Sequence, residues 1–141
     1  KTSKERAVTL GDIARIMTSK GEVDEALKLH RERIEVYNNL GDLDGIANTL
    51  WSMAQIDIAK KDHQKAYERL SESYNINMKL GRLDGICFVG YDLGRILCGG
   101  GHKDEGLKML KHSRDGFIQL GQQKLAQQIN QLIDDIEGKH N

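Results

Sequence analysis

The chain has 141 residues, 38% of them hydrophobic, and its 21 Lys and Arg residues balance its 21 Asp and Glu residues. This length fits a single domain spanning residues 1–141. A net charge of zero excludes the bulk electrostatic attraction that brings basic proteins to nucleic acid or to anionic membranes. We therefore expect neither nucleic acid nor a membrane among the partners of this chain.

The predicted elements are helices separated by glycine turns. Proline is absent, so the helix ends must be made by glycine and by polar capping residues. Left-handed glycines are expected after the leucines that close apolar-periodic stretches, at Gly41, Gly81 and Gly121. A second set of turns falls between these, at Gly21, Lys61 and Gly101. In chain order the pattern predicts helices at residues 4–19, 23–39, 44–59, 63–79, 84–98, 103–119 and 123–137.

The helices repeat with a period of forty residues. The run LGDLDGIA at 40–47 returns as LGRLDGIC at 80–87, and its Leu-Gly returns at 120–121. A fixed period of helix pairs is typical of stacked units, because one pair buries too little apolar surface to offset the entropy of ordering its chain. We therefore expect an all-α solenoid of antiparallel helix pairs, with repeats at about 7–46, 47–86 and 87–126 and a glutamine-rich capping helix at 123–137.

Small residues recur at one place in each helix of a pair, where two helix backbones would cross closely. They are Ala14, Ala54 and Gly94 in the first helices and Ala26, Ala66 and Gly106 in the second helices. With Leu10, Leu50 and Leu93 before or beside them, these positions resemble the tetratricopeptide repeat over residues 7–137. A unit of forty residues that ends in Leu-Gly without proline is similar to the longer subclass of that family, found in spindle-orientation adaptors and in the sensor arms of bacterial signal-transduction ATPases.

The resemblance implies a right-handed superhelix whose first helices line a concave groove. Transferred by register, the candidate peptide-binding residues of that groove are Arg15, Asn48, Trp51, Gln55, Phe88, Tyr91 and Arg95, with Val8 and Gly11 beside them. Aromatic rings next to arginines suit a peptide that offers apolar anchors and a carboxylate. The sequence therefore predicts a non-catalytic scaffold for protein–protein interaction that binds an apolar and acidic peptide segment of another protein.

Two alternatives concern the residues and one concerns the function. Trp51 or Phe88 would instead be packing if it wedges between adjacent repeats, and Arg15 and Arg95 would be neutralised if they pair with Asp12 and Asp92. The alternative function is a structural or regulatory arm of a larger signalling protein, able to associate with a second copy of itself. Such an arm would expose apolar surface on its terminal helices, whereas a recognition module would expose it in the groove.

Neither a catalytic site nor a cofactor or metal site is expected. The run GGGHK at 99–103 lacks the strand before it and the Ser or Thr after its lysine that a phosphate loop needs. The histidines fall at no metal-ligand spacing and are predicted to lie at the surface or the edge of the core, at His30, His63, His102, His112 and His140.

The spacing of the two cysteines indicates the cellular compartment in which the protein is found. Cys87 and Cys98 lie in one predicted helix about 16 Å apart along its axis, which is beyond the reach of a disulfide. Free thiols are typical of a reducing compartment, so we expect a cytoplasmic location. The first residue is Lys1, which fits a fragment of a larger protein.

Overall fold

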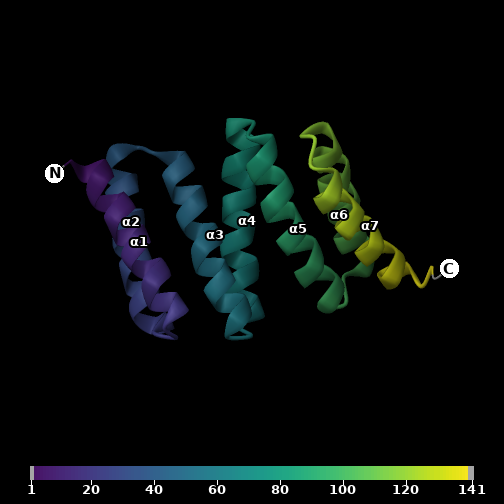
Figure 1. Ribbon diagram of the computed structural model, residues 1–141, viewed down its shortest axis with the longest axis horizontal. Coiled ribbons are helices and arrows are strands. Elements are labelled where there is room, and N and C mark those ends of the chain that lie inside the picture. Colours follow the sequence, from purple (N-terminus) through teal and green to yellow (C-terminus); the bar gives the residue numbers. More distant parts are fainter. Residues whose placement is uncertain (1, 140–141) are drawn as a thin grey trace. The chain divides into compact units, whose positions relative to one another are not determined.

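The computed structural model describes residues 2–139, and in this range it contains helices and no strand (Figure 1). The helices are α1 (Ser3–Ser19), α2 (Val23–Leu40), α3 (Leu43–Ala59), α4 (His63–Leu80), α5 (Leu83–Gly99), α6 (Lys103–Gln119) and α7 (Gln123–Glu137). Each predicted helix is present, and its ends differ from the predicted ends by at most one residue. The prediction of an all-α fold built from consecutive helix pairs is confirmed.

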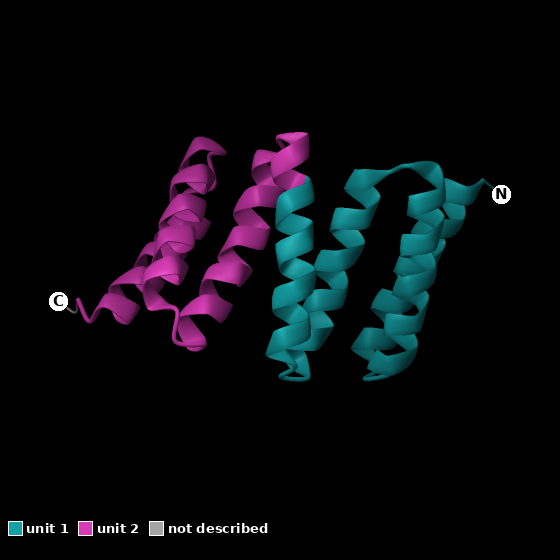
Figure 2. Cartoon of the chain, turned by 180° about the vertical axis from the view of Figure 1, so that it is seen from behind, with its two compact units in different colours: residues 1–76 teal, residues 77–141 magenta. Residues whose placement is uncertain are grey.

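Contacts divide the chain into two compact units, residues 1–76 and 77–141 (Figure 2). In the first unit α1 packs on α2, and α2 packs on α3. In the second unit α5 packs on α6, and α6 packs on α7.

The turns between the helices have the conformation that the glycine pattern predicts. Gly41, Gly81 and Gly121 have φ angles of 67°, 67° and 75°, in the left-handed region where a side chain is disfavoured. Lys61 also lies in this region, with a φ angle of 62°. The equivalent residues forty positions before and after it, Gly21 and Gly101, are glycines. The register of the repeat therefore fixes this backbone conformation even where the residue does not favour it.

The core of the first unit forms where small residues let the helices approach. Ala14 of α1 and Ala26 of α2 are both fully buried, and they pack in one cluster with Leu27, Met53 and Ile56. A second cluster consists of Ala7, Val36, Tyr37, Ile46 and Leu50. Burying each large aliphatic side chain stabilises the fold by about 1.5–3 kcal/mol.

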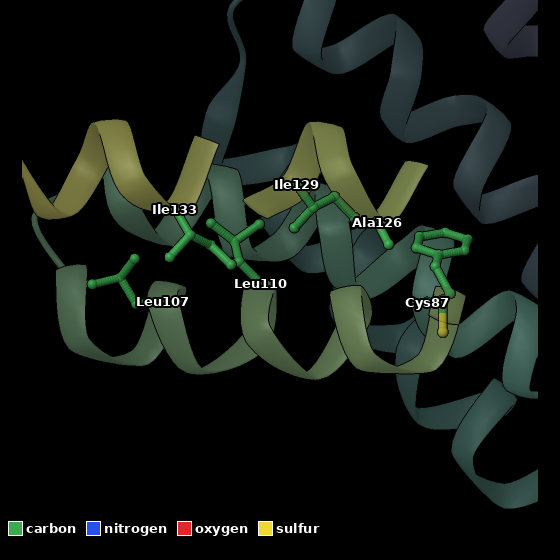
Figure 3. Close-up of a cluster of buried hydrophobic side chains, with 7 residues drawn as sticks. Cys87, Leu107, Leu110, Ala126, Ile129 and Ile133 are labelled. Atoms are coloured by element: carbon green, nitrogen blue, oxygen red, sulfur yellow. The ribbon is translucent and has the colours of Figure 1, made fainter. Parts of the chain in front are cut away.

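The core of the second unit joins α5, α6 and α7. Its cluster contains Cys87, Leu107, Leu110, Phe117, Ala126, Ile129 and Ile133, and Figure 3 shows Leu110 pointing toward Ile129 and Ile133 of α7. Here the close crossing uses glycine, since a Cβ on Gly106 would lie 2.7 Å from the carbonyl oxygen of Gly94. Cys87 and Cys98 are both free thiols, as predicted.

Replacing Lys61 by glycine is expected to stabilise the protein. Because a residue with a side chain is strained at φ 62°, Lys61→Gly should raise the free energy of unfolding by about 1 kcal/mol, measured by urea denaturation followed by circular dichroism. The neighbouring Lys60 has right-handed backbone, with φ −80° and ψ −4°, so Lys60→Gly is the matched control and should lower stability. A Lys61→Gly protein no more stable than the wild type would contradict the assignment of strain.

Candidate functional site

The first unit contains a groove of about 440 Å³ to which α1, α2 and α3 all contribute. Its apolar lining includes Val8 from α1, Val23 from α2 and Ile56 from α3. Its polar lining includes Arg15 from α1 together with His30 and Arg33 from α2. The Asp12 carboxylate of α1 also lines it, so the groove combines aliphatic surface with cationic, imidazole and carboxylate groups.

Three of the predicted site residues meet in this groove. Arg15 of α1 lines it together with Trp51 and Gln55 of α3, and Trp51 is half-buried. The two neighbouring positions named by the register, Val8 and Gly11, line it as well. Helices α1 and α3 are the first helices of successive repeats. Residues forty positions apart on them, such as Arg15 and Gln55, therefore line the same groove.

The other predicted residues lie elsewhere. Asn48 is exposed on α3. Phe88, Tyr91 and Arg95 form a separate group on α5 in the second unit. The Phe88 ring is 45% exposed and packs edge-on against the buried Phe117 ring, with 4.9 Å between the centroids. The Arg95 guanidinium lies over the Tyr91 ring, 5.2 Å from its centroid.

The charge of Arg15 is already partly balanced. Its guanidinium Nη2 lies 3.1 Å from the Asp12 carboxylate one turn earlier on α1, and both side chains are largely exposed. This is the pairing that the sequence offered as an alternative. An exposed ion pair of this kind contributes at most about 1 kcal/mol, so Arg15 stays available to a ligand only in competition with Asp12.

The second helix of the pair contributes two side chains that sequence reasoning did not select, His30 and Arg33. His30 is 4% exposed although it carries an ionisable ring. Its Nδ1 lies 3.1 Å from Nη1 of Arg33 one turn later on α2. The Arg33 guanidinium also lies over the Tyr37 ring, at 5.8 Å from its centroid.

Burial and nearby cations act together on His30. Loss of hydration on burial, which has the largest effect, and the positive charges of Arg33 and Arg69 together lower the pKa of His30 from 6.5 to about 4. The ring is therefore neutral at neutral pH, and its unprotonated nitrogen can accept a hydrogen bond from Arg33. Arg69 itself forms an ion pair with the buried carboxylate of Asp57 on α3.

A comparison of residues forty positions apart in the sequence could have identified His30 and Arg33. His30 corresponds to Leu70 and Leu110, which are fully buried leucines. Arg33 corresponds to the buried Ser73 and Ser113. An ionisable pair therefore stands where the rest of the chain has an apolar residue and a small one.

Other classes of site have no support in the part of the chain that the structure describes. Residues 2–139 contain no cluster of three or more His, Cys, Asp or Glu side chains able to hold a metal ion. His140, one of the five histidines considered above, lies outside the described residues. None of the described helices is both long and apolar enough to cross a membrane.

Comparison with known proteins identifies the family. A family model described as tetratricopeptide repeat matches residues 5–79. The chain belongs to the tetratricopeptide repeat family. Tetratricopeptide repeat domains are typically non-catalytic scaffolds for protein–protein interaction, so the broad class of function predicted from the sequence agrees with the family. No curated protein matches the chain.

Two solved structures share the fold. The crystal structure of nearly identical TPR-like repeats from a putative kinesin light chain of Podosopora anserina, and that of its Q17M variant, each match at a TM-score of 0.62 and 18% identity. Each match covers 95% of this tetratricopeptide repeat chain and 76% of the other. YrrB, a TPR protein described as having an unusual peptide-binding site, matches at a TM-score of 0.43 and 13% identity, with 97% and 89% covered.

The buried His30 makes stability depend on pH. Its folded-state pKa is below the unfolded value, so the unfolded chain binds a proton more readily and stability falls as pH drops from 6.5 toward about 4, by roughly 3 kcal/mol in total. His30→Leu, which copies Leu70 and Leu110, should flatten the pH dependence of unfolding in that window, measured by urea denaturation at each pH. Replacing the exposed His112 by leucine controls for the loss of a histidine. Equal slopes in wild type and His30→Leu would rule out this role.

Proposed function

We propose that this tetratricopeptide repeat chain is a non-catalytic scaffold whose groove in the first unit binds a peptide segment with apolar and acidic side chains. The single observation that supports the proposal most is that Trp51, Arg15 and Arg33 line one groove. Aromatic and arginine side chains contribute most of the binding energy in protein interfaces.

The apolar part of the ligand would contact the aromatic and aliphatic lining. Val8 is 51% exposed, Trp51 is half-buried, and both line the groove together with Ile56. Covering such surface contributes about 25 cal/mol per Å². An apolar side chain of a peptide is therefore a suitable occupant.

The acidic part of the ligand would contact the guanidinium groups. Arginine binds carboxylates through paired hydrogen bonds, which fix the orientation as well as adding binding energy. Gln55 and the exposed Asn48 add amide groups on α3 that suit the backbone of an extended peptide. In the second unit we include Phe88, Tyr91 and Arg95 by register, since they offer the same chemistry of rings and a guanidinium.

Because both cysteines are free thiols, we propose a cytoplasmic location for this function.

A second candidate function is self-association through α1. Ile13 and Ile16 are 39% and 55% exposed, whereas their equivalents forty residues later, Met53 and Ile56, are 2% and 3% exposed. Apolar exposure on a terminal helix is what a self-associating arm of a larger protein would have. If this function holds, Ile13→Ser with Ile16→Ser should dissociate an oligomer in analytical ultracentrifugation, whereas a wild-type chain that sediments as a monomer at high concentration would exclude it.

Peptide binding is tested by selection from a random peptide library. Trp51→Ala should weaken the binding of wild-type-selected peptides by about tenfold or more while circular dichroism shows an unchanged helical spectrum. The matched control is Tyr67→Ala, which removes a 40% exposed ring on α4 that does not line the groove. A folded Trp51→Ala protein that keeps its affinity for every selected peptide would contradict the groove assignment.

A further inference from the structure

We propose that Arg33 and His30 of α2 form a carboxylate-binding subsite in the groove, and that the missing side chain at Gly11 of α1 gives the Arg33 guanidinium the space to reach the groove, where it binds an Asp or Glu side chain of the peptide. The inference rests on the proposed function and names the group of the protein that selects the acidic residue. It places that group on a second helix, not among the first-helix residues that the family register names.

The first repeat exchanges a large and a small side chain between its two helices. At the register position of Gly11, the next two repeats have Trp51 and Tyr91, and at the position of Arg33 they have the buried serines Ser73 and Ser113. The first repeat therefore has a small residue on its first helix and a large residue on its second helix, the reverse of the other two. Such paired changes keep the packed volume similar while they change the chemistry of the lining.

The geometry around Gly11 shows that the two changes depend on each other. A Cβ at residue 11 would lie 2.7 Å from Cζ and 2.9 Å from Nε of Arg33. Any residue other than glycine would therefore press on the guanidinium, which occupies the space left free by the absent side chain. Because Gly11 and Arg33 both line the groove, this contact lies at its surface.

The guanidinium of Arg33 retains hydrogen-bonding capacity. Of its five N–H donors, one on Nη1 is directed at His30, while Nε is buried without a hydrogen-bond partner. The other arginines near it have carboxylate partners, since Arg15 pairs with Asp12 and Arg69 pairs with Asp57. For Arg33, the described part of the chain provides no carboxylate partner.

A partly buried cation without a counterion is unfavourable, and an arriving carboxylate would correct this. His30 does not compete for that carboxylate as a cation, because its ring is neutral at neutral pH. Instead it holds one edge of the guanidinium in place, which leaves the rest for the ligand. An Asp or Glu side chain has the charge and the planar pair of oxygens that this arrangement accepts.

The test is a parallel selection from one random peptide library with wild type, Arg33→Gln and Arg31→Gln. Arg31 is an exposed arginine on the same helix, so it controls for the loss of one positive charge. We expect wild type and Arg31→Gln to enrich peptides with one Asp or Glu among apolar residues. We expect Arg33→Gln to enrich apolar peptides without that preference and to bind the wild-type peptides about tenfold to a hundredfold more weakly.

Gly11→Ala is the second variant, and it leaves the charge of Arg33 unchanged. Its methyl group should displace the guanidinium and so remove the acidic preference, even if Arg33→Gln fails to fold. NMR titration of His30 is an independent readout. Binding of a selected acidic peptide should raise the pKa of His30, because a negative charge then offsets part of the effect of Arg33.

The outcomes separate this inference from the proposed function. If wild type enriches apolar peptides with no acidic residue, or if both Arg33→Gln and Gly11→Ala keep the acidic preference, the subsite is wrong while groove binding stands. If wild type enriches no peptide at all, the proposed function fails, and the subsite fails with it. Loss of the acidic preference in Arg31→Gln to the same degree as in Arg33→Gln would also overturn the subsite, because the effect would then be one of general charge.

Discussion

The fold depends on close packing between paired helices at residues with small side chains. Ala14 and Ala26 are fully buried in one cluster of the first unit, and Gly94 and Gly106 let α5 and α6 approach in the second unit. This approach brings the aliphatic side chains on either side into contact, and their burial offsets the entropy of ordering helices that are too short to be stable alone. In the first unit the groove depends on the same packing, because α1, α2 and α3 all contribute to its lining.

The sequence was sufficient to predict the helices because their boundaries are set by local rules. Left-handed glycines end helices through backbone geometry, and a fixed period transfers each boundary to the next repeat. Lys61 illustrates how strong the register is, since the turn forms there without glycine. Arg15, Trp51 and Gln55 were also predictable as neighbours, because equivalent positions on α1 and α3 face one groove.

The rest of the site was not predictable by the same reasoning. His30 and Arg33 lie on α2, which the register assigns to packing, and only the three-dimensional contact with Gly11 brings Arg33 to the groove. Their burial and the low pKa of His30 depend on neighbours from several helices, including Arg69 of α4. The sequence also did not determine whether Arg15 pairs with Asp12. The two residues are three positions apart on a helix, and at that spacing the arginine side chain can adopt rotamers that form the ion pair and rotamers that do not.

Three positions of the first repeat thus depart from the pattern of the others, and we infer that they lower stability in exchange for recognition. The most direct measurement is the free energy of unfolding of Gly11→Trp, His30→Leu, Arg33→Ser, a triple variant that copies Trp51, Leu70 and Ser73. The variant removes a partly buried cation that has no carboxylate partner among the described residues and replaces a buried imidazole by leucine, and both changes remove a cost of burying polar groups. A triple variant that is more stable than the wild type in urea denaturation and that no longer selects acidic peptides is the expected result. A triple variant that is less stable than the wild type would show that Gly11, His30 and Arg33 stabilise the fold, and would contradict the inference that they lower stability in exchange for recognition.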